Sequence, residues 1–176
     1  MMTRTAIITF GITVRAALLL ANSGEIVGWG YNQYGQAHGS PGMDVVQYVS
    51  VAAGGEHTLA ITTNATVTGW GDNAYGQVSC PAGAGFSAVA AGNAHSLGLS
   101  NGAVLAWGDN LSGQLNAPSN ADFVAIAAGG EHSVGLTADG RCIAWGNNDY
   151  GQTNVPYGED YIQITAGEYH SLALRR

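Results

Sequence analysis

The nine residues GWGDNAYGQ, at 69–77, decide the fold because the chain repeats them at regular intervals. Near copies read GWGYNQYGQ at 28–36, AWGDNLSGQ at 106–114 and AWGNNDYGQ at 144–152. Each copy contains one tryptophan, and successive tryptophans are 41, 37 and 38 residues apart. A unit of about 38 residues that recurs through a chain is typical of a solenoid, a propeller or another array of repeats.

A histidine motif keeps the same period and provides a second, independent landmark. It reads EHTLAI, AHSLGL, EHSVGL and YHSLAL, and its histidines are His57, His95, His132 and His170. Two landmarks with one period indicate that the copied unit covers nearly the whole chain. We therefore expect a single domain, 1–176, with repeats at about 5–40, 45–83, 86–119 and 123–156 and a partial repeat at 160–174.

Each unit contains three short strand patterns, which we name A, B and C, separated by glycine-bearing turns. In one unit they read FVAIAAG at 123–129, HSVGLT at 132–137 and RCIAWG at 141–146. Strand B alternates large and small side chains, so the bulky face of one sheet can pack onto the small face of the next. The pattern predicts an all-β fold: a β-propeller or propeller arc of about four short blades, mainly of three antiparallel strands each.

The quoted motif itself combines a seam residue with a turn. Strand C ends at Trp-Gly, and the Asp-Asn or Asn-Asn and Gly-Gln that follow are residues that favour turns. We expect the tryptophan, which occurs once per copy, to fill the outer seam between neighbouring copies.

The composition argues against two classes of protein. The net charge is −7 and only five residues are Lys or Arg, whereas a nucleic-acid surface needs clustered basic residues. The apolar stretches are too short and too interrupted for a transmembrane helix. Cys80 and Cys142 occupy different places in the repeat, so we interpret them as free small apolar residues rather than a disulfide.

The stretch AAGGEHSVGLTADGRCIAWGNNDYGQTNVP, at 127–156, resembles the repeat of the regulator of chromosome condensation family. The short units look most like the bacterial branch of that family, which includes a secreted β-lactamase inhibitor propeller. The resemblance implies a propeller fold and allows an inhibitor-like role. It does not imply the nucleotide-exchange and chromatin roles of the eukaryotic namesake, because this chain has no basic stretch.

The start of the chain departs from the pattern. Residues 15–20 fall where the histidine motif belongs but have no histidine, so the first copy is degenerate. Alternatively, residues 1–24 are a secretory signal, although Arg15 within the apolar stretch argues against this. The compartment, cytoplasmic or secreted, stays open.

Several patterns suggest chemistry but have a simpler structural interpretation. The four motif histidines are spaced by a blade width, which is too far apart to share a zinc ion. Glu56 and His57 are adjacent in a strand and face opposite ways, with no converging partner for acid–base catalysis. We therefore expect structural histidines, no catalytic residue, no metal, no cofactor and no enzymatic activity.

The non-repeating loop tips are the candidate binding surface, because rigid scaffolds carry specificity on their loops. The A-to-B tips share one rim and include Glu56, Asn93, Glu131, Glu168 and Tyr169. We expect the turns that carry Tyr34, Tyr75 and Tyr150 on the opposite side. The leading hypothesis is a non-enzymatic protein-binding scaffold with an unknown protein partner. The alternative is a structural or assembly component, or a self-associating array fragment without a foreign partner.

The two ends of the repeat pattern complement each other. The tail, 161–174, has strands A and B without a strand C, whereas a well-formed strand C at 25–30 follows a poor A and B. The tail therefore fits strand 25–30. Closing four blades into a ring would turn each by about 90°, whereas two chains that exchange tails would turn each of eight by about 45°. Since the resemblance implies propellers that close with about seven blades, we expect a tail-exchanged homodimer rather than a closed monomer or an open arc.

Overall fold

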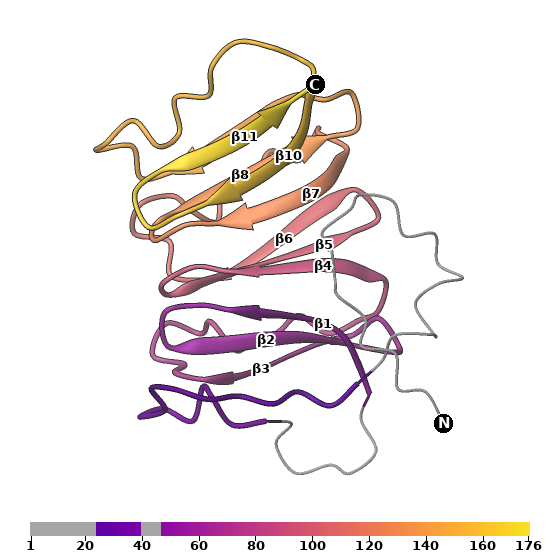
Figure 1. Ribbon diagram of the computed structural model, residues 1–176, viewed down its shortest axis with the longest axis vertical. Helices are drawn as coiled ribbons and strands as arrows, with labels where there is room; N and C mark the ends of the chain where they lie inside the picture. Colours follow the sequence, from indigo (N-terminus) through magenta and orange to yellow (C-terminus); the bar gives the residue numbers. More distant parts are fainter. Residues whose placement is uncertain (1–23, 40–46) are drawn as a thin grey trace, which may run out of the picture.

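The computed structural model describes residues 24–39 and 47–176, and in these residues every regular element is a β-strand. Three sheets have three strands: β1 (Tyr48–Ala53), β2 (His57–Thr62) and β3 (Val67–Gly71); β4 (Phe86–Ala91), β5 (His95–Ser100) and β6 (Ala103–Gly108); β7 (Phe123–Ala128), β8 (His132–Thr137) and β9 (Cys142–Gly146). A fourth sheet contains β10 (Tyr161–Ala166) and β11 (Ser171–Arg175). The sheets stack in chain order along the longest axis (Figure 1).

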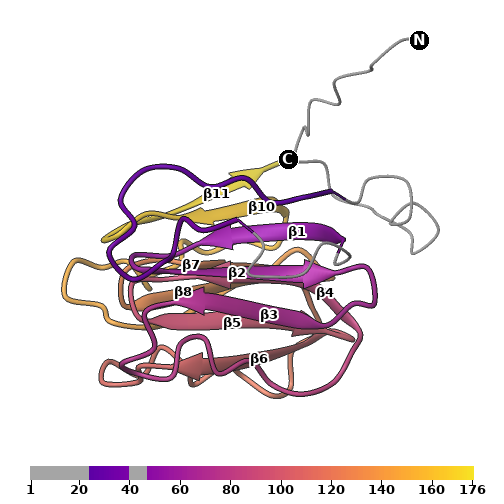
Figure 2. The same ribbon diagram turned by 90° about the horizontal axis from the view of Figure 1, so that it is seen from below.

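In each three-stranded sheet, the second strand along the chain lies between the first and the third, and all pairs are antiparallel. The register is the same in every copy, with Trp107 opposite Ser96 and Trp145 opposite Ser133. The turns gather at the two ends of the strands and form two rims (Figure 1, Figure 2). The predicted all-β propeller blades are therefore confirmed.

The bulky face of each middle strand packs onto the next sheet. Leu97 and Leu99 in β5 are at most 3% exposed. Leu99 clusters with Phe123 and Trp145 of the following blade. The opposite face of the middle strand has small side chains because a ring of the same blade covers it. A Cβ on Gly135 would lie 2.3 Å from the Phe123 ring. The bulky face of strand B is therefore buried against the next blade as predicted, but it packs onto the aromatic rings that cover the small face of that blade rather than onto the small face itself.

The predicted seam position is confirmed for three of the four motif tryptophans. Trp70, Trp107 and Trp145 are each 8% exposed. Each indole Nε1 donates a hydrogen bond to a backbone carbonyl of the preceding repeat, at Gln36, Gln77 and Gln114 respectively, over 2.8–3.2 Å. The prediction is wrong for Trp29, which is 85% exposed because no blade precedes it among the described residues.

The head of the chain differs from the expectation. Residues 25–30 were expected to form a strand C but form no strand, and only Gly24 makes a bridge, to Tyr48. A strand needs a hydrogen-bonding partner for its backbone groups, and no described strand pairs with 25–30. The degenerate start of the first copy, 1–20, and all but the last residue of the alternative signal segment, 1–24, lie outside the described residues.

The tail, β10–β11, has strands A and B as expected. Within one chain it does not pair with 25–30, because the two segments lie at opposite ends of an open stack (Figure 1). Cys80 and Cys142 are free thiols, as expected. The described residues contain no helix long and apolar enough to cross a membrane.

Candidate protein-binding rim

The residues after each strand C build a closely hydrogen-bonded loop. Gln77 donates from Nε2 to Asp72 over 2.7 Å and accepts at Oε1 from the backbone N–H of Tyr75 over 2.9 Å. Asn73 accepts from the backbone N–H of Val78 over 3.0 Å. The same bonds recur around Gln114 and Gln152. The motif that repeats through the sequence therefore specifies a rigid loop, with Asp72 already engaged by Gln77 rather than free to bind an ion.

These loops lie on the same side of the stack as the A-to-B turns. The backbone N–H of Asp72 donates to the carbonyl of Glu56 over 2.8 Å, and that of Asn147 donates to the carbonyl of Glu131 over 2.9 Å. The expectation that the tyrosine-bearing turns lie on the opposite side is therefore wrong. With three antiparallel strands, strand C ends where strand A ends.

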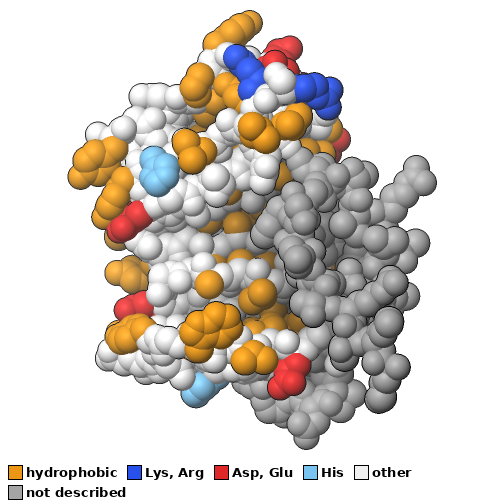
Figure 3. All heavy atoms as spheres, viewed as in Figure 1, with side chains coloured by type: hydrophobic (Ala, Val, Ile, Leu, Met, Phe, Trp, Pro, Cys, Tyr) orange, Lys and Arg blue, Asp and Glu red, His pale blue; other side chains and the backbone are white. Residues whose placement is uncertain are grey.

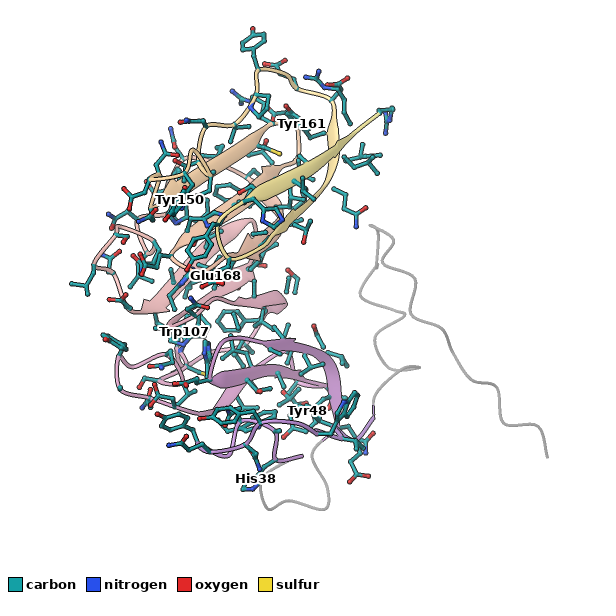
Figure 4. All side chains as sticks on the ribbon, turned by 60° about the vertical axis from the view of Figure 1, so that its left-hand side comes forward. His38, Tyr48, Trp107, Tyr150, Tyr161 and Glu168 are labelled. Atoms are coloured by element: carbon teal, nitrogen blue, oxygen red, sulfur yellow. The ribbon has the colours of Figure 1, made fainter. Side chains whose placement is uncertain are left out.

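We call this surface the loop rim: turns 54–56, 92–94, 129–131 and 167–170, together with loops 31–38, 72–79, 109–116 and 147–154. Of the residues expected in the binding face, Asn93, Glu131, Glu168 and Tyr169 are exposed and Glu56 is half-buried. The loops add large exposed side chains to this face, namely Tyr31, Tyr34, Tyr75, Leu111 and Tyr150. Figure 4 shows Tyr150 and Glu168 on the same side of the stack.

Contacts between loops of different blades join the rim into one surface. Glu131 accepts from Ser112 in the loop of the preceding blade over 3.0 Å, and from Asn147 in its own blade over 3.5 Å. The rings of Tyr150 and Tyr169 meet edge to face, with centroids 5.3 Å apart. Because these side chains are already restrained, less binding free energy is lost in ordering them when a partner binds.

The loop rim is strongly acidic. Its carboxylates are Glu56, Asp72, Asp109, Glu131, Asp149 and Glu168, and its described residues include no Lys or Arg. The described arginines lie elsewhere: Arg141 in a turn of the opposite rim, and Arg175 and Arg176 at the far end of β11. Glu56 raises the pKa of the Tyr34 hydroxyl by charge repulsion, and a hydrogen bond to Glu168 raises the pKa of the Tyr169 hydroxyl. Tyrosines therefore sit within a negative surface.

A sequence model described as the regulator of chromosome condensation (RCC1) repeat matches residues 48–77, 86–114 and 123–152, which together make up half of the chain. The chain belongs to the RCC1 repeat family. The matched segments coincide with the three complete blades and the loops that follow them. The predicted family membership is therefore confirmed.

Solved structures place these RCC1 repeats among propellers. The ectodomain of the receptor kinase CR4 from Physcomitrella patens is 29% identical, with a TM-score of 0.73 over 84% of this chain and 43% of that one. The CRINKLY WD40 ectodomain of the receptor kinase ACR4 from Arabidopsis thaliana is 26% identical, with a TM-score of 0.67 over 84% and 52%. Prp20p from Saccharomyces cerevisiae shares the fold at 19% identity, with a TM-score of 0.68 over 78% and 45%.

The chain thus spans about half the length of these solved relatives. Among curated protein sequences, none matches it.

The RCC1 histidines form hydrogen bonds across the seams between blades. The Nε2 atoms of His57, His95 and His132 lie 2.9–3.0 Å from the hydroxyls of Ser96, Ser133 and Ser171 in the next blade. We call this chain of contacts the histidine ladder. Each serine donates its hydrogen to the carbonyl of a glutamine, at Gln77, Gln114 and Gln152. The histidine must therefore donate to the serine from Nε2, which leaves Nδ1 as the unprotonated nitrogen.

This geometry does not support nucleophilic catalysis by the ladder. A catalytic serine donates its proton to the histidine, whereas here the serine proton points to a backbone carbonyl. His95 and Ser133 are both fully buried, so no substrate reaches them. Among the described residues no cluster of His, Cys, Asp or Glu is arranged to hold a metal ion. The ladder histidines stabilise the seams, as the sequence predicts.

Proposed function

We propose that this chain is a non-enzymatic protein-binding scaffold, and that the loop rim binds a protein partner through a basic patch. One observation carries the proposal: six carboxylates and several exposed tyrosines share this rim, and no Lys or Arg is present among its described residues. Acidic groups attract and orient a basic partner, mainly by raising the rate of association. Exposed tyrosines provide large contact areas, and tyrosine is common among the residues that contribute most of the binding energy of interfaces.

The relatives support this class of function. The structure of Prp20p is described together with its binding to Gsp1p and histones, and yeast RCC1 (Prp20) has been solved bound to Kap60. For this chain, those complexes indicate that the fold can serve as a protein-binding scaffold, with a partner of its own. Inhibition of an enzyme by the loop rim is one form that such binding would take.

The partner can be sought by using the chain as bait in an extract of the cells that produce it. At low salt we expect the wild-type chain to retain one foreign protein in near-stoichiometric amount. The triple variant Glu56→Gln, Glu131→Gln and Glu168→Gln should retain much less, because it removes three rim charges. The matched control neutralises three carboxylates of the opposite rim, Asp122, Asp139 and Glu159, and should retain the partner as the wild type does.

With the partner identified, its rate of association should fall by about tenfold or more as salt rises, because added ions screen exposed charges beyond about 8 Å at physiological ionic strength. Surface plasmon resonance at a series of salt concentrations measures this rate. A rate that is independent of salt and unchanged in the rim variant would contradict the assignment of the loop rim. Recovery of copies of the chain alone would favour the alternative, an assembly component.

A further inference from the structure

The tail of the stack exposes an apolar face that is buried in every internal blade. Leu172 and Leu174 in β11 are 60% and 54% exposed. Their counterparts in β5, Leu97 and Leu99, are 0% and 3% exposed because the next blade covers them. Figure 3 shows exposed hydrophobic side chains at this end of the stack, beside the basic ones. The tail therefore presents a surface shaped for a further blade.

Beside this face lies a vacant tryptophan position. β11 pairs with β10 along one edge, and no described strand pairs with its other edge. A cavity of about 230 Å³ adjoins that free edge, with Gln152, Val155, Ser171 and Leu172 among its lining residues. In the internal seams, the indoles of Trp107 and Trp145 occupy the equivalent place, and each shares the carbonyl of the preceding glutamine as hydrogen-bond acceptor with a serine of strand B. At the tail, Ser171 donates to the Gln152 carbonyl over 2.8 Å, but no described tryptophan does.

The head of the chain carries a tryptophan without a blade. Trp29 is 85% exposed and ends a segment, 25–30, whose sequence is that of a strand C. The loop after it is already docked, because the carbonyl of Gln36 accepts from Thr58 over 2.8 Å and from Trp70 over 3.2 Å. The segment is thus anchored next to the first complete blade, but none of the described strands pairs with it.

Among the described residues the histidine ladder is also open at both ends, and the two ends have matching groups. At the tail, His170 occupies the position of the ladder histidines and is exposed. At the head, Thr58 occupies the position of Ser96 and, like the ladder serines, donates its hydroxyl to a glutamine carbonyl. No described histidine bonds the Thr58 hydroxyl. A histidine of a preceding blade would complete it.

We infer that the tail of one copy of this chain binds the head of a second copy. Segment 25–30 of the second copy adds to the free edge of β11 as the third strand of that sheet. Trp29 fills the cavity and donates to the carbonyl of Gln152, as Trp145 does to Gln114. The first complete blade of the second copy then covers Leu172 and Leu174, and its Thr58 bonds His170.

The register follows from the internal blades. In the first complete blade, Thr58 lies opposite Trp70 and Ala60 lies opposite Thr68. Transferred to the new sheet, this pairing places Ser171 opposite Trp29 and Ala173 opposite Val27.

A second copy fits better than the head of the same chain. The head and the tail lie at opposite ends of the stack (Figure 1). The stack superposes on 43% of the CR4 ectodomain with a TM-score of 0.73, so its blades are arranged much as in that part of the protein. Closing one chain on itself would require a much tighter curvature. Two copies related by a twofold axis supply about the length of one such propeller, and both of their head-to-tail contacts form at once.

Light scattering with size-exclusion chromatography tests the association. At micromolar concentration we expect a mass of twice the 18.0 kDa of one chain. Trp29→Ala should give a single chain with unchanged circular dichroism, because this side chain is exposed within one copy. The control Leu111→Ala removes another exposed apolar side chain, 87% exposed, and should leave the doubled mass. A wild-type chain with the mass of one copy would overturn the proposal, as would a Trp29→Ala variant that keeps the doubled mass.

A disulfide tests the register and identifies which copy supplies the strand. In a background with Cys80→Ala and Cys142→Ala, the variants Val27→Cys and Ala173→Cys place two thiols opposite each other. Opposed residues of antiparallel strands have Cα atoms about 4.5–5.5 Å apart, a distance that a disulfide spans. Oxidation should give a covalent dimer on a non-reducing gel, and neither single-cysteine variant should. A disulfide formed within one chain, or none at all, would overturn the proposal.

Discussion

Replacing Trp107 by alanine should lower the free energy of unfolding by about 3–5 kcal/mol, as truncation of a large buried aromatic side chain does. The indole is 8% exposed and lies in the seam between the first and second complete blades. Its removal opens a cavity there and also deletes the 2.8 Å hydrogen bond from Nε1 to the carbonyl of Gln77. Urea denaturation followed by circular dichroism measures the change.

The milder variant Trp107→Phe separates packing from hydrogen bonding. It keeps a buried ring but loses the N–H donor. The Gln77 carbonyl still accepts from Ser96 over 2.7 Å, so the lost hydrogen bond itself should cost only about 1 kcal/mol. Leu111→Ala is the control for an exposed apolar side chain and should change stability by less than about 0.5 kcal/mol. A loss below about 1 kcal/mol for Trp107→Ala would contradict the seam assignment.

The second large effect is a loss of stability on mild acidification. The pKa values of His57 and His95 are lowered from 6.5 to about 4, mainly by burial, and for His95 repulsion from the neighbouring ladder histidines is a second cause of this shift. The geometry gives the reason: Nε2 already donates to the next blade, and Nδ1 is buried without a partner among the described residues. Protonation would add a charge and an N–H donor at Nδ1 with no acceptor.

The direction of the pH effect follows from the lowered pKa values. Between pH 6.5 and pH 4 the unfolded chain binds protons at these histidines and the folded chain does not. Stability is therefore full above pH 6.5 and falls as the pH is lowered toward 4. For a shift of this size the loss is on the order of 3 kcal/mol per histidine. Asp139 contributes outside this window, because its hydrogen bond with Arg141 lowers its pKa from 3.8 to about 2.

Urea midpoints measured from pH 7 to pH 4 test this prediction. The variant His95→Gln keeps an N–H donor for Ser133 but cannot titrate, so its midpoint should fall less over the same range. Midpoints that stay constant between pH 7 and pH 4.5 in the wild-type chain would contradict the assignment of buried, neutral ladder histidines.

The repeat period, the three strands of each blade and the burial of the bulky face of strand B were all predictable from the sequence. These features depend on residues that are close in the chain or one repeat away, and the sequence pattern behind each feature recurs in several copies. The seam position of Trp70, Trp107 and Trp145 followed for the same reason, because every internal copy meets the same neighbours.

The composition of the loop rim was only partly predictable. The exposed positions of Asn93, Glu131, Glu168 and Tyr169 agree with their expected place in the A-to-B turns. The side assigned to Tyr75 and Tyr150 was wrong, although the sequence contains the signal that would have corrected it. Three antiparallel strands per blade return the chain to the side where strand A ends.

The sequence by itself determined the blade, because its strands, turns and alternating faces are local patterns that repeat. Only the tertiary structure decided which side chains of each copy are buried at its place in the stack. Trp29 and Trp70 stand in nearly identical motifs, yet one is 85% exposed and the other 8%. The physical reason is that a side chain is buried by the elements packed around it. The loop that contains Gln36 packs beside Trp70, whereas no described blade packs beside Trp29.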